Sequence, residues 1–143
     1  MSKLVDITEA VKDELNAGVF SESFTATRQF LLVRELSANE TLRVDVVPAR
    51  KIKEGSTRAA DFSDYRVGVA IRKKLTGAAS TDDAALVDLL DLAEEIENAF
   101  FHKRLANYNE AACVGVVTET PLQFEDLDRL RQFTATIELI FRA

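Results

Sequence analysis

Two side chains have the chemistry of a catalytic centre, His102 and Cys113. A histidine can act as a general base and a cysteine thiolate as a nucleophile. His102 stands beside Lys103 and Arg104 after a long predicted helix, where a solvated residue that complements the helix dipole is the simpler interpretation. Cys113 precedes Val114 in an apolar run, with no local basic pair or helix start to lower its pKa. Neither residue indicates an enzyme.

The common catalytic and nucleotide-binding motifs are absent from the sequence. It contains no GxxxxGK[ST] phosphate loop, no GxGxxG, no GxSxG nucleophile elbow and no HExxH helix. One cysteine and one histidine cannot supply the usual ligands of a structural zinc site, and one cysteine cannot form an intramolecular disulfide. We therefore expect no catalytic residues, no cofactor and no metal ion.

Carboxylates gather between residues 81 and 97, where seven acidic side chains occur without a basic one. Asp88, Asp91 and Glu95 are spaced by three and four residues, which places them on one face of a helix. Three interpretations remain open. The run is a solvated face, or it is an electrostatic interface or a surface that repels DNA, or it binds a cation, although no EF-hand pattern supports that last interpretation.

Basic residues gather in a different part of the chain. Residues 49–75 carry eight Lys or Arg against three acids, whereas residues 76–143 carry five against thirteen. The basic residues that we single out as a candidate subunit interface are Arg50, Lys51, Lys53 and Arg58. Opposite patches on one small chain suit a head-to-tail ring, in which the basic face of one copy meets the acidic face of the next. Uncorrelated surface charge and a nucleic-acid patch, with only Phe62 and Tyr65 for stacking, are the alternatives.

Length and composition predict one globular domain over residues 1–143. Hydrophobic residues make up 47% and charged residues 29% of the 143 residues, close to the average of soluble proteins. A net charge of −6 disfavours a protein that wraps nucleic acid over its whole surface. No run approaches the roughly 18 apolar residues of a membrane span, and the acidic start has no signal-like apolar region. We expect synthesis in the cytoplasm and no membrane partner.

The first expected element is a short amphipathic helix. Its capping box would be Asp6 with Glu9, and Gly18 would stop it. Its apolar stripe recurs every fourth residue, at Ile7, Val11 and Leu15.

Three runs of alternating residues then predict half-buried antiparallel strands. The first starts at Phe24 and places Ala26 and Phe30 on one face. The second spans 42–46, is closed by Pro48, and is joined to the first by a hairpin at 37–40. The third spans 65–72. Between the second and third, residues 49–63 form a long basic hairpin or loop, and connections of that length tend to be functional or disordered.

The second half of the chain contains the main predicted core helix. It is capped at Ser80, carries an apolar stripe from Leu86 to Phe100, and has 102–104 at its negative end. A polar break at 107–110 precedes a strand around 114–117. One or two helical turns over 124–130 and a strictly alternating strand over 132–141 complete the chain.

Together these elements predict an α+β fold. It consists of a mostly antiparallel sheet, with the long helix and the short N-terminal helix packed on one face, plus the extended basic hairpin or loop. Such a sheet has edges, which must be blunted, covered or paired with another subunit.

The order of elements and several local patterns resemble the tail terminator, or tail-completion, proteins of long-tailed bacteriophages and prophages. The resemblance covers nearly the whole chain and rests on structural patterns rather than on a catalytic signature. The patterns are Leu4–Val11 with Leu15–Asn16, Leu42–Pro48, Asp64–Val67 leading into Ile71–Leu75, Asp88–Ile96, and Leu130–Thr134.

The resemblance implies a virion structural protein without catalytic residues. Its subunits form a ring, typically a hexamer, that caps the tail tube and presents a surface to the head connector or stopper protein in the neck. By position, Arg50 to Arg58 corresponds to a hairpin or loop that contacts neighbours or the tube. Asp88, Asp91 and Glu95 would then face the channel, where like charges keep the DNA from sticking as it passes without specific binding.

Three alternatives stay open. Another neck component, such as a head-completion or head–tail connector protein, would share most of these features. A small α+β ligand-binding or enzyme domain would need a concave pocket with converging polar groups. A nucleic-acid-binding accessory protein would bind DNA with an affinity that depends on salt.

Overall fold

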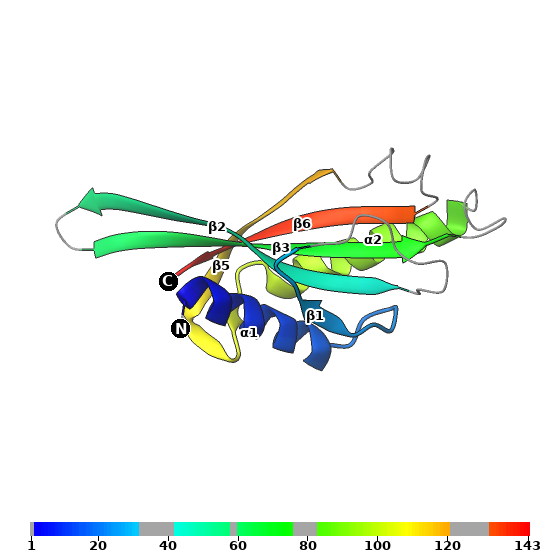
Figure 1. Cartoon of the computed structure of the whole chain (residues 1–143), viewed down its shortest axis with the longest axis horizontal. Helices are drawn as coiled ribbons and strands as arrows, with labels where there is room; N and C mark the ends of the chain where they lie inside the picture. Colours follow the sequence, from blue (N-terminus) through cyan, green and yellow to red (C-terminus); the bar gives the residue numbers. More distant parts are fainter. Residues whose placement is uncertain (1, 32–41, 58–59, 76–82, 121–131) are drawn as a thin grey trace.

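A computed structural model describes residues 2–31, 42–57, 60–75, 83–120 and 132–143. In this part of the chain two helices and six strands form an α+β fold, as predicted. The elements, in chain order, are α1 (Lys3–Ala17), β1 (Ala26–Arg28), β2 (Arg43–Thr57), β3 (Ala60–Lys74), α2 (Asp83–Phe100), β4 (Arg104–Leu105), β5 (Tyr108–Thr120) and β6 (Gln132–Arg142) (Figure 1).

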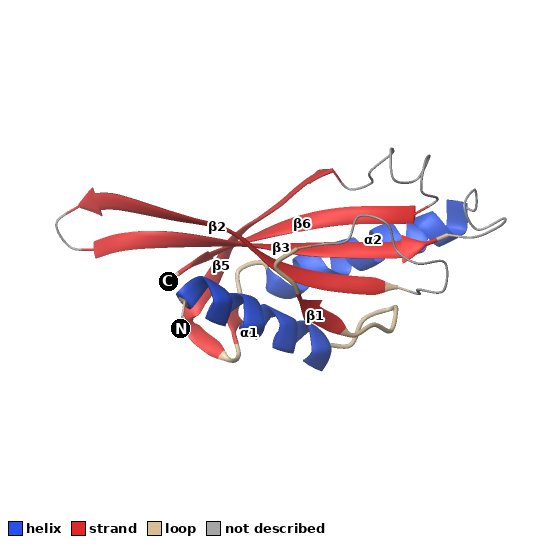
Figure 2. Cartoon of the chain, in the orientation of Figure 1, coloured by secondary structure: helices blue, strands red, loops and turns tan. Residues whose placement is uncertain are grey.

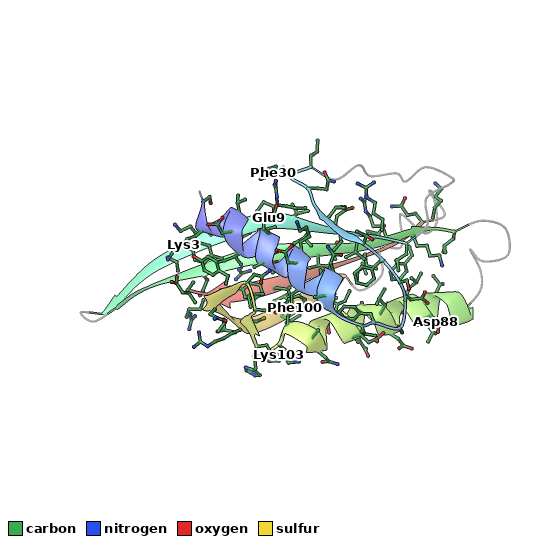
Figure 3. The ribbon with its side chains drawn as sticks, turned by 90° about the horizontal axis from the view of Figure 1, so that it is seen from below. Lys3, Glu9, Phe30, Asp88, Phe100 and Lys103 are labelled. Carbon is green, nitrogen blue, oxygen red and sulfur yellow. The ribbon has the colours of Figure 1, made fainter. Side chains whose placement is uncertain are left out.

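The strands form one sheet in the order β1-β2-β3-β6-β5-β4. All neighbouring pairs are antiparallel except β1 with β2. Both helices lie on the same face of the sheet, which Figure 3 shows from the helix side. The opposite face, on which no helix of the described residues lies, is termed the helix-free face. The last strand, β6, occupies the middle of the sheet between β3 and β5, and the strand predicted over 132–141 is confirmed.

The core lies between the helices and the sheet, and the alternating residues of the strands fill it. Val67, Val69 and Ile71 of β3 face Leu139, Ile137 and Ala135 of β6, and all six are fully buried. Leu89, Leu92, Ile96 and Phe100 of α2 and Ile7, Val11 and Leu15 of α1 complete this cluster. The ring of Phe100 meets that of Phe141 edge-on, with centroids 6.4 Å apart. The predicted apolar stripe of α1 is therefore its core contact. In α2 the buried face also includes Leu92, which the prediction left out, whereas Leu86 and Leu90 are only partly buried.

The capping of α1 differs from the prediction. The helix begins at Lys3, so Asp6 lies in its first turn rather than at its cap, and the flanking Ser2 makes no side-chain capping bond. Glu9 points across the surface instead and pairs with Lys12 and Arg28. Gly18 does end the helix, because its N–H donates to the carbonyls of Glu14 and Leu15.

The predicted hairpin between the first two strands is wrong. β1 spans only Ala26–Arg28 and runs parallel to β2, with Ala26 opposite Val44. Parallel neighbours need a crossover of about a dozen residues, and residues 29–42 are long enough to provide it. Residues 37–40 themselves lie outside the described part of the chain. The predicted inward alternation also fails after β1, since Phe30 is 67% exposed.

Two further boundaries differ from the prediction. β2 does not stop at Pro48 but continues to Thr57, because a register shift between Pro48 and Arg50 accommodates the proline. The polar break at 107–110 is instead the start of β5, which pairs with the two-residue β4. The predicted helical turns over 124–130 and the Ser80 cap lie outside the described residues.

Candidate functional site: a projecting hairpin and an acidic face

The basic segment forms a β-hairpin that projects from the body of the molecule. β2 and β3 remain paired from Arg43 opposite Arg72 out to Thr57 opposite Ala60. Their far half extends beyond both helices and beyond the rest of the sheet (Figure 2). The segment predicted as a hairpin or loop is therefore an extended hairpin.

The structure places three of the four predicted basic interface residues on this hairpin. Arg50 and Lys51 are exposed on β2, and Lys53 follows in the same strand. Arg58 lies outside the described residues. Lys51 faces Tyr65 across the strands, and its Nζ lies 5.5 Å from the centre of that ring. The aromatic ring holds the lysine stem near the sheet while the charge stays at the surface.

The predicted acidic residues share one face of α2, as their spacing required. Asp88 and Asp91 are exposed and Glu95 is partly buried. They border a depression of about 380 Å³ together with Ser21 and Glu22 from the segment after α1.

Glu95 has a partner that the sequence did not reveal. The backbone N–H of Ser21 donates to Glu95 Oε1 at 3.1 Å, and the Ser21 hydroxyl donates to Oε2. Glu95 thus positions the segment after α1 against α2, whereas Asp88 and Asp91 make no hydrogen bond or ion pair with the side chains that the structure describes.

The basic hairpin and the acidic face lie at opposite ends of the long axis of the molecule. The β2–β3 hairpin extends from one end, and the half of α2 that carries Asp88 lies towards the other (Figure 1). The view turned by 90° shows the same separation, with the β2–β3 hairpin at one end of the long axis and Asp88 towards the other (Figure 3). Arg50 and Lys51 therefore lie far from Asp88. Arg72, Lys73 and Lys74 of the same basic segment lie at the other end of β3, away from the tip of the hairpin.

A buried ionic cluster, which the sequence analysis missed, lies on the helix-free face. Asp45 of β2 has no exposed surface, although the alternation assigned it to the polar side of its strand. One of its oxygens accepts from Arg72 at 2.7 Å and Arg43 at 2.9 Å, and the other accepts from Thr27 at 2.6 Å. The sequence places Arg43 and Asp45 on the same side of one strand, which indicates that they can pair. The burial of Asp45 could not be predicted, because it depends on residues from other strands.

The two residues that first suggested catalysis lie close to each other without forming a catalytic pair. His102 is exposed at the end of α2, has a φ of 62°, and stacks on Phe101 with centroids 3.9 Å apart. Its backbone N–H donates to the carbonyl of Cys113. Burial raises the pKa of the Cys113 thiol, which donates to the carbonyl of Gly115 at 3.4 Å. The thiol is therefore held in its less nucleophilic, protonated form.

Neither a metal centre nor a membrane helix emerges from the part of the chain that the structure describes. No group of three or more His, Cys, Asp or Glu side chains there is arranged to hold a metal ion. No helix there is long and apolar enough to cross a bilayer.

Comparison with known proteins gives a likeness in structure but none in sequence. No protein-family model matches the chain, and no curated protein sequence matches it. Among solved structures, the chain is similar to the sheath/tube terminator of PVC, an extracellular contractile injection system, determined by cryo-EM in the extended state. The TM-score is 0.50 at 13% sequence identity, and the alignment covers 100% of this chain. This chain spans 57% of the length of that protein. The likeness shows that the chain shares the fold of that part of the protein.

Proposed function

We propose that this chain is a tail terminator, a structural protein that forms a ring at the top of a phage tail tube. There it would end the polymerisation of the tube and form the junction with the head connector. The observation that carries the proposal is the fold, which the whole chain shares with a sheath/tube terminator. The resemblance of the sequence to phage tail terminators, which rests on different evidence, points to the same role.

The placement of charge supports a ring of identical subunits. The hairpin with Arg50 and Lys51 and the helix face with Asp88 and Asp91 lie at opposite ends of one molecule. A head-to-tail contact between copies of such a molecule uses two different surfaces, and it closes into a ring when the rotation allows it. The resemblance suggests six subunits.

The partners follow from this position in the particle. They are neighbouring copies, the tail tube protein, the head connector, and DNA that passes through the channel without specific binding. The protein would reside in the neck of the virion after synthesis in the bacterial cytoplasm. We further propose that the acidic residues 88, 91 and 95 line the channel, where they would repel the DNA backbone.

We also propose that the protein has no enzymatic activity and needs no cofactor. In the described part of the chain the exposed His102 stacks on Phe101, and the Cys113 thiol is buried with a raised pKa. A terminator acts by shape and by surface, so its function needs no reactive group.

The ring is tested by the mass of the purified protein in solution. Light scattering behind a sizing column, over a range of concentration and Mg²⁺, should detect a species of about six subunits. Negative-stain images of that species should show a closed ring with a central hole. A monomer in every condition, also after addition of isolated tail tubes, would contradict the proposal.

A further inference from the structure

The sheet ends in two strands whose outer sides are only partly covered. On one side β1 pairs with Val44–Val46 of β2, and no described strand pairs with the outer side of β2 from Arg50 to Thr57. On the other side β4 pairs with β5 as far as Ala112, and the last backbone bonds reach Cys113. No described strand pairs with β5 from Val114 to Thr120 on that side.

The free edge of β5 is apolar between two irregularities. The edges of monomeric sheets usually carry lysine, proline, an inward charge or a β-bulge, or are covered by a helix or loop. β5 has register shifts between Cys113 and Gly115 and between Val117 and Thr120, and the regular stretch between them pairs with β6. The stretch from Val114 to Val117 contains only valine and glycine, and Val114 is 41% exposed. An apolar edge of this kind is a template for a further strand.

The direction of the strands determines how the two edges can meet. β3 is antiparallel to β2, β6 to β3, and β5 to β6, so β5 runs opposite to β2. If the β5 edge of one copy joins the β2 edge of the next with the sheets continuing in the same sense, the new pair is antiparallel. Antiparallel pairing is the more stable geometry. The contact uses two different surfaces, so it propagates from copy to copy and can close into a ring.

Charge on the helix side of the sheet is complementary across this contact. Lys51 lies on that side, because it faces the buried Tyr65. Beside the β5 edge, on the same side, the hydroxyl of Thr118 donates to Glu97 of α2. With Arg50 opposite Val117 and Lys51 opposite Val116, the lysine ammonium would approach the Glu97 carboxylate. A second copy of this chain therefore supplies the opposite charge.

We propose that the free β5 edge, from Val114 to Thr120, pairs antiparallel with the outer edge of β2 in a second copy, so that the sheet continues from subunit to subunit. This inference rests on the proposed ring, to which it adds the surface that joins the subunits. The projecting hairpin is then a strand donor whose backbone supplies the hydrogen bonds and whose basic side chains fix the register.

Disulfide trapping tests the pairing. Facing residues on adjacent antiparallel strands have Cα atoms about 4.5–5.5 Å apart, a distance that a disulfide can bridge. Arg50 faces Arg66, Val117 faces Glu138, and Arg66 pairs with Glu138, so Arg50 and Val117 share the helix-free face. The double variant Arg50→Cys, Val117→Cys, oxidised under mild conditions, should give a ladder of covalent multimers on a denaturing gel.

Matched controls separate this contact from others. Each single variant should stay monomeric on the gel, because a head-to-tail contact never brings two copies of one residue together. The pair Arg50→Cys, Val116→Cys places the thiols on opposite faces and should not link. The wild type should not link either, because Cys113 is 1% exposed and its pKa is raised.

The outcomes distinguish the inference from the proposed function. A ladder through Val117, or through Gly115→Cys if the strands slide by two residues on the same face, supports the pairing. If light scattering shows a ring but Arg50→Cys forms no disulfide with either Val117→Cys or Gly115→Cys, the pairing is overturned and the terminator role stays intact. Links in the single variants indicate a two-fold contact and overturn it too. A protein that never forms a ring overturns both.

Discussion

The residue whose role is clearest is Asp45, the centre of the buried ionic cluster. Its side chain has no exposed surface and Arg72 retains 3%. Removing one member of a buried ion pair leaves the other charge without compensation, which typically costs about 3–5 kcal/mol. We predict a loss of that order in the free energy of unfolding for Asp45→Ala, measured by urea denaturation.

A surface ion pair provides the comparison for Asp45. Asp64 accepts from Arg142 Nε at 2.9 Å, but the arginine side chain is 47% exposed. Exposed pairs contribute at most about 1 kcal/mol. Asp64→Ala should therefore cost far less than Asp45→Ala, and equal losses would mean that the burial of Asp45 does not matter.

Glu9 gives the protein part of its pH dependence. Hydrogen bonds from Lys12, and then from Arg28, lower the pKa of Glu9 below its ordinary value of 4.5. The carboxylate therefore stabilises the fold above the unfolded pKa, and this stabilisation is lost as the pH falls through the lower folded pKa. We predict that Glu9→Gln flattens the fall in melting temperature between about pH 5 and about pH 3.

The size of the Glu9 effect is limited by its exposure. Its side chain is 34% exposed, so the loss of stability at neutral pH should stay below about 1 kcal/mol. Glu110→Gln, at an exposed position in β5, is the matched control and should leave the acid limb unchanged. If the melting temperature of Glu9→Gln falls with decreasing pH as steeply as that of the wild type, Glu9 does not contribute to the pH dependence.

At the scale of elements, one side chain attaches β1 to α1. The Asn16 amide accepts from the Ala26 N–H at 2.7 Å and donates to the Ala26 carbonyl at 3.1 Å, as a neighbouring strand would. It thereby closes the outer edge of a three-residue strand whose Ala26 is almost fully buried.

We predict that Asn16→Ala releases β1. It leaves two backbone groups of a buried residue without their partner, at a cost of about 1–3 kcal/mol. Hydrogen exchange at Ala26 should accelerate more than exchange in β3 and β6. Asn16→Asp keeps the acceptor for the Ala26 N–H and should lose less. Equal acceleration throughout the sheet would mean that β1 is not a separate unit.

At the scale of the whole molecule, the proposed ring depends on charge at the hairpin. Lys51→Glu should reduce the fraction of ring measured by light scattering. It places a carboxylate next to Glu97 of the adjacent subunit in the proposed ring, and the two like charges repel. Lys103→Glu makes the same change in charge at an exposed residue away from the hairpin and should leave the ring intact. Added salt should weaken the wild-type ring, since exposed charges are screened. Equal behaviour of the two variants would contradict a role for the hairpin.

Reversal of the acidic face tests the proposed channel. Lysine at 88, 91 and 95 together would replace repulsion of the DNA backbone by attraction. We expect impaired DNA passage or assembly in an infection assay that depends on this protein. Infectivity equal to the wild type would remove the channel role while leaving the ring to its own test.

Most helices and strands, and the faces that they bury, could be predicted from the sequence alone. Helical spacing at Ile7, Val11 and Leu15 and strict alternation in Phe133 to Phe141 predicted which side chains form the core, and these are buried. Such periods arise from backbone geometry within one element, so they can be read without knowing its neighbours. For the same reason, the spacing of Asp88, Asp91 and Glu95 was sufficient to predict that they share one face of a helix.

Which elements pack or pair with one another could not be predicted from the sequence. The parallel placement of β1, the burial of Asp45 between two arginines, and the pairing of β4 with β5 each depend on residues distant in the chain. Neither polarity nor period specifies a partner strand, because a short strand can pair in either direction. The separation of the basic hairpin from the acidic helix face along the molecule follows from this packing. The strand order leaves the outer sides of β2 and β5 partly unpaired, and we propose that these join between subunits.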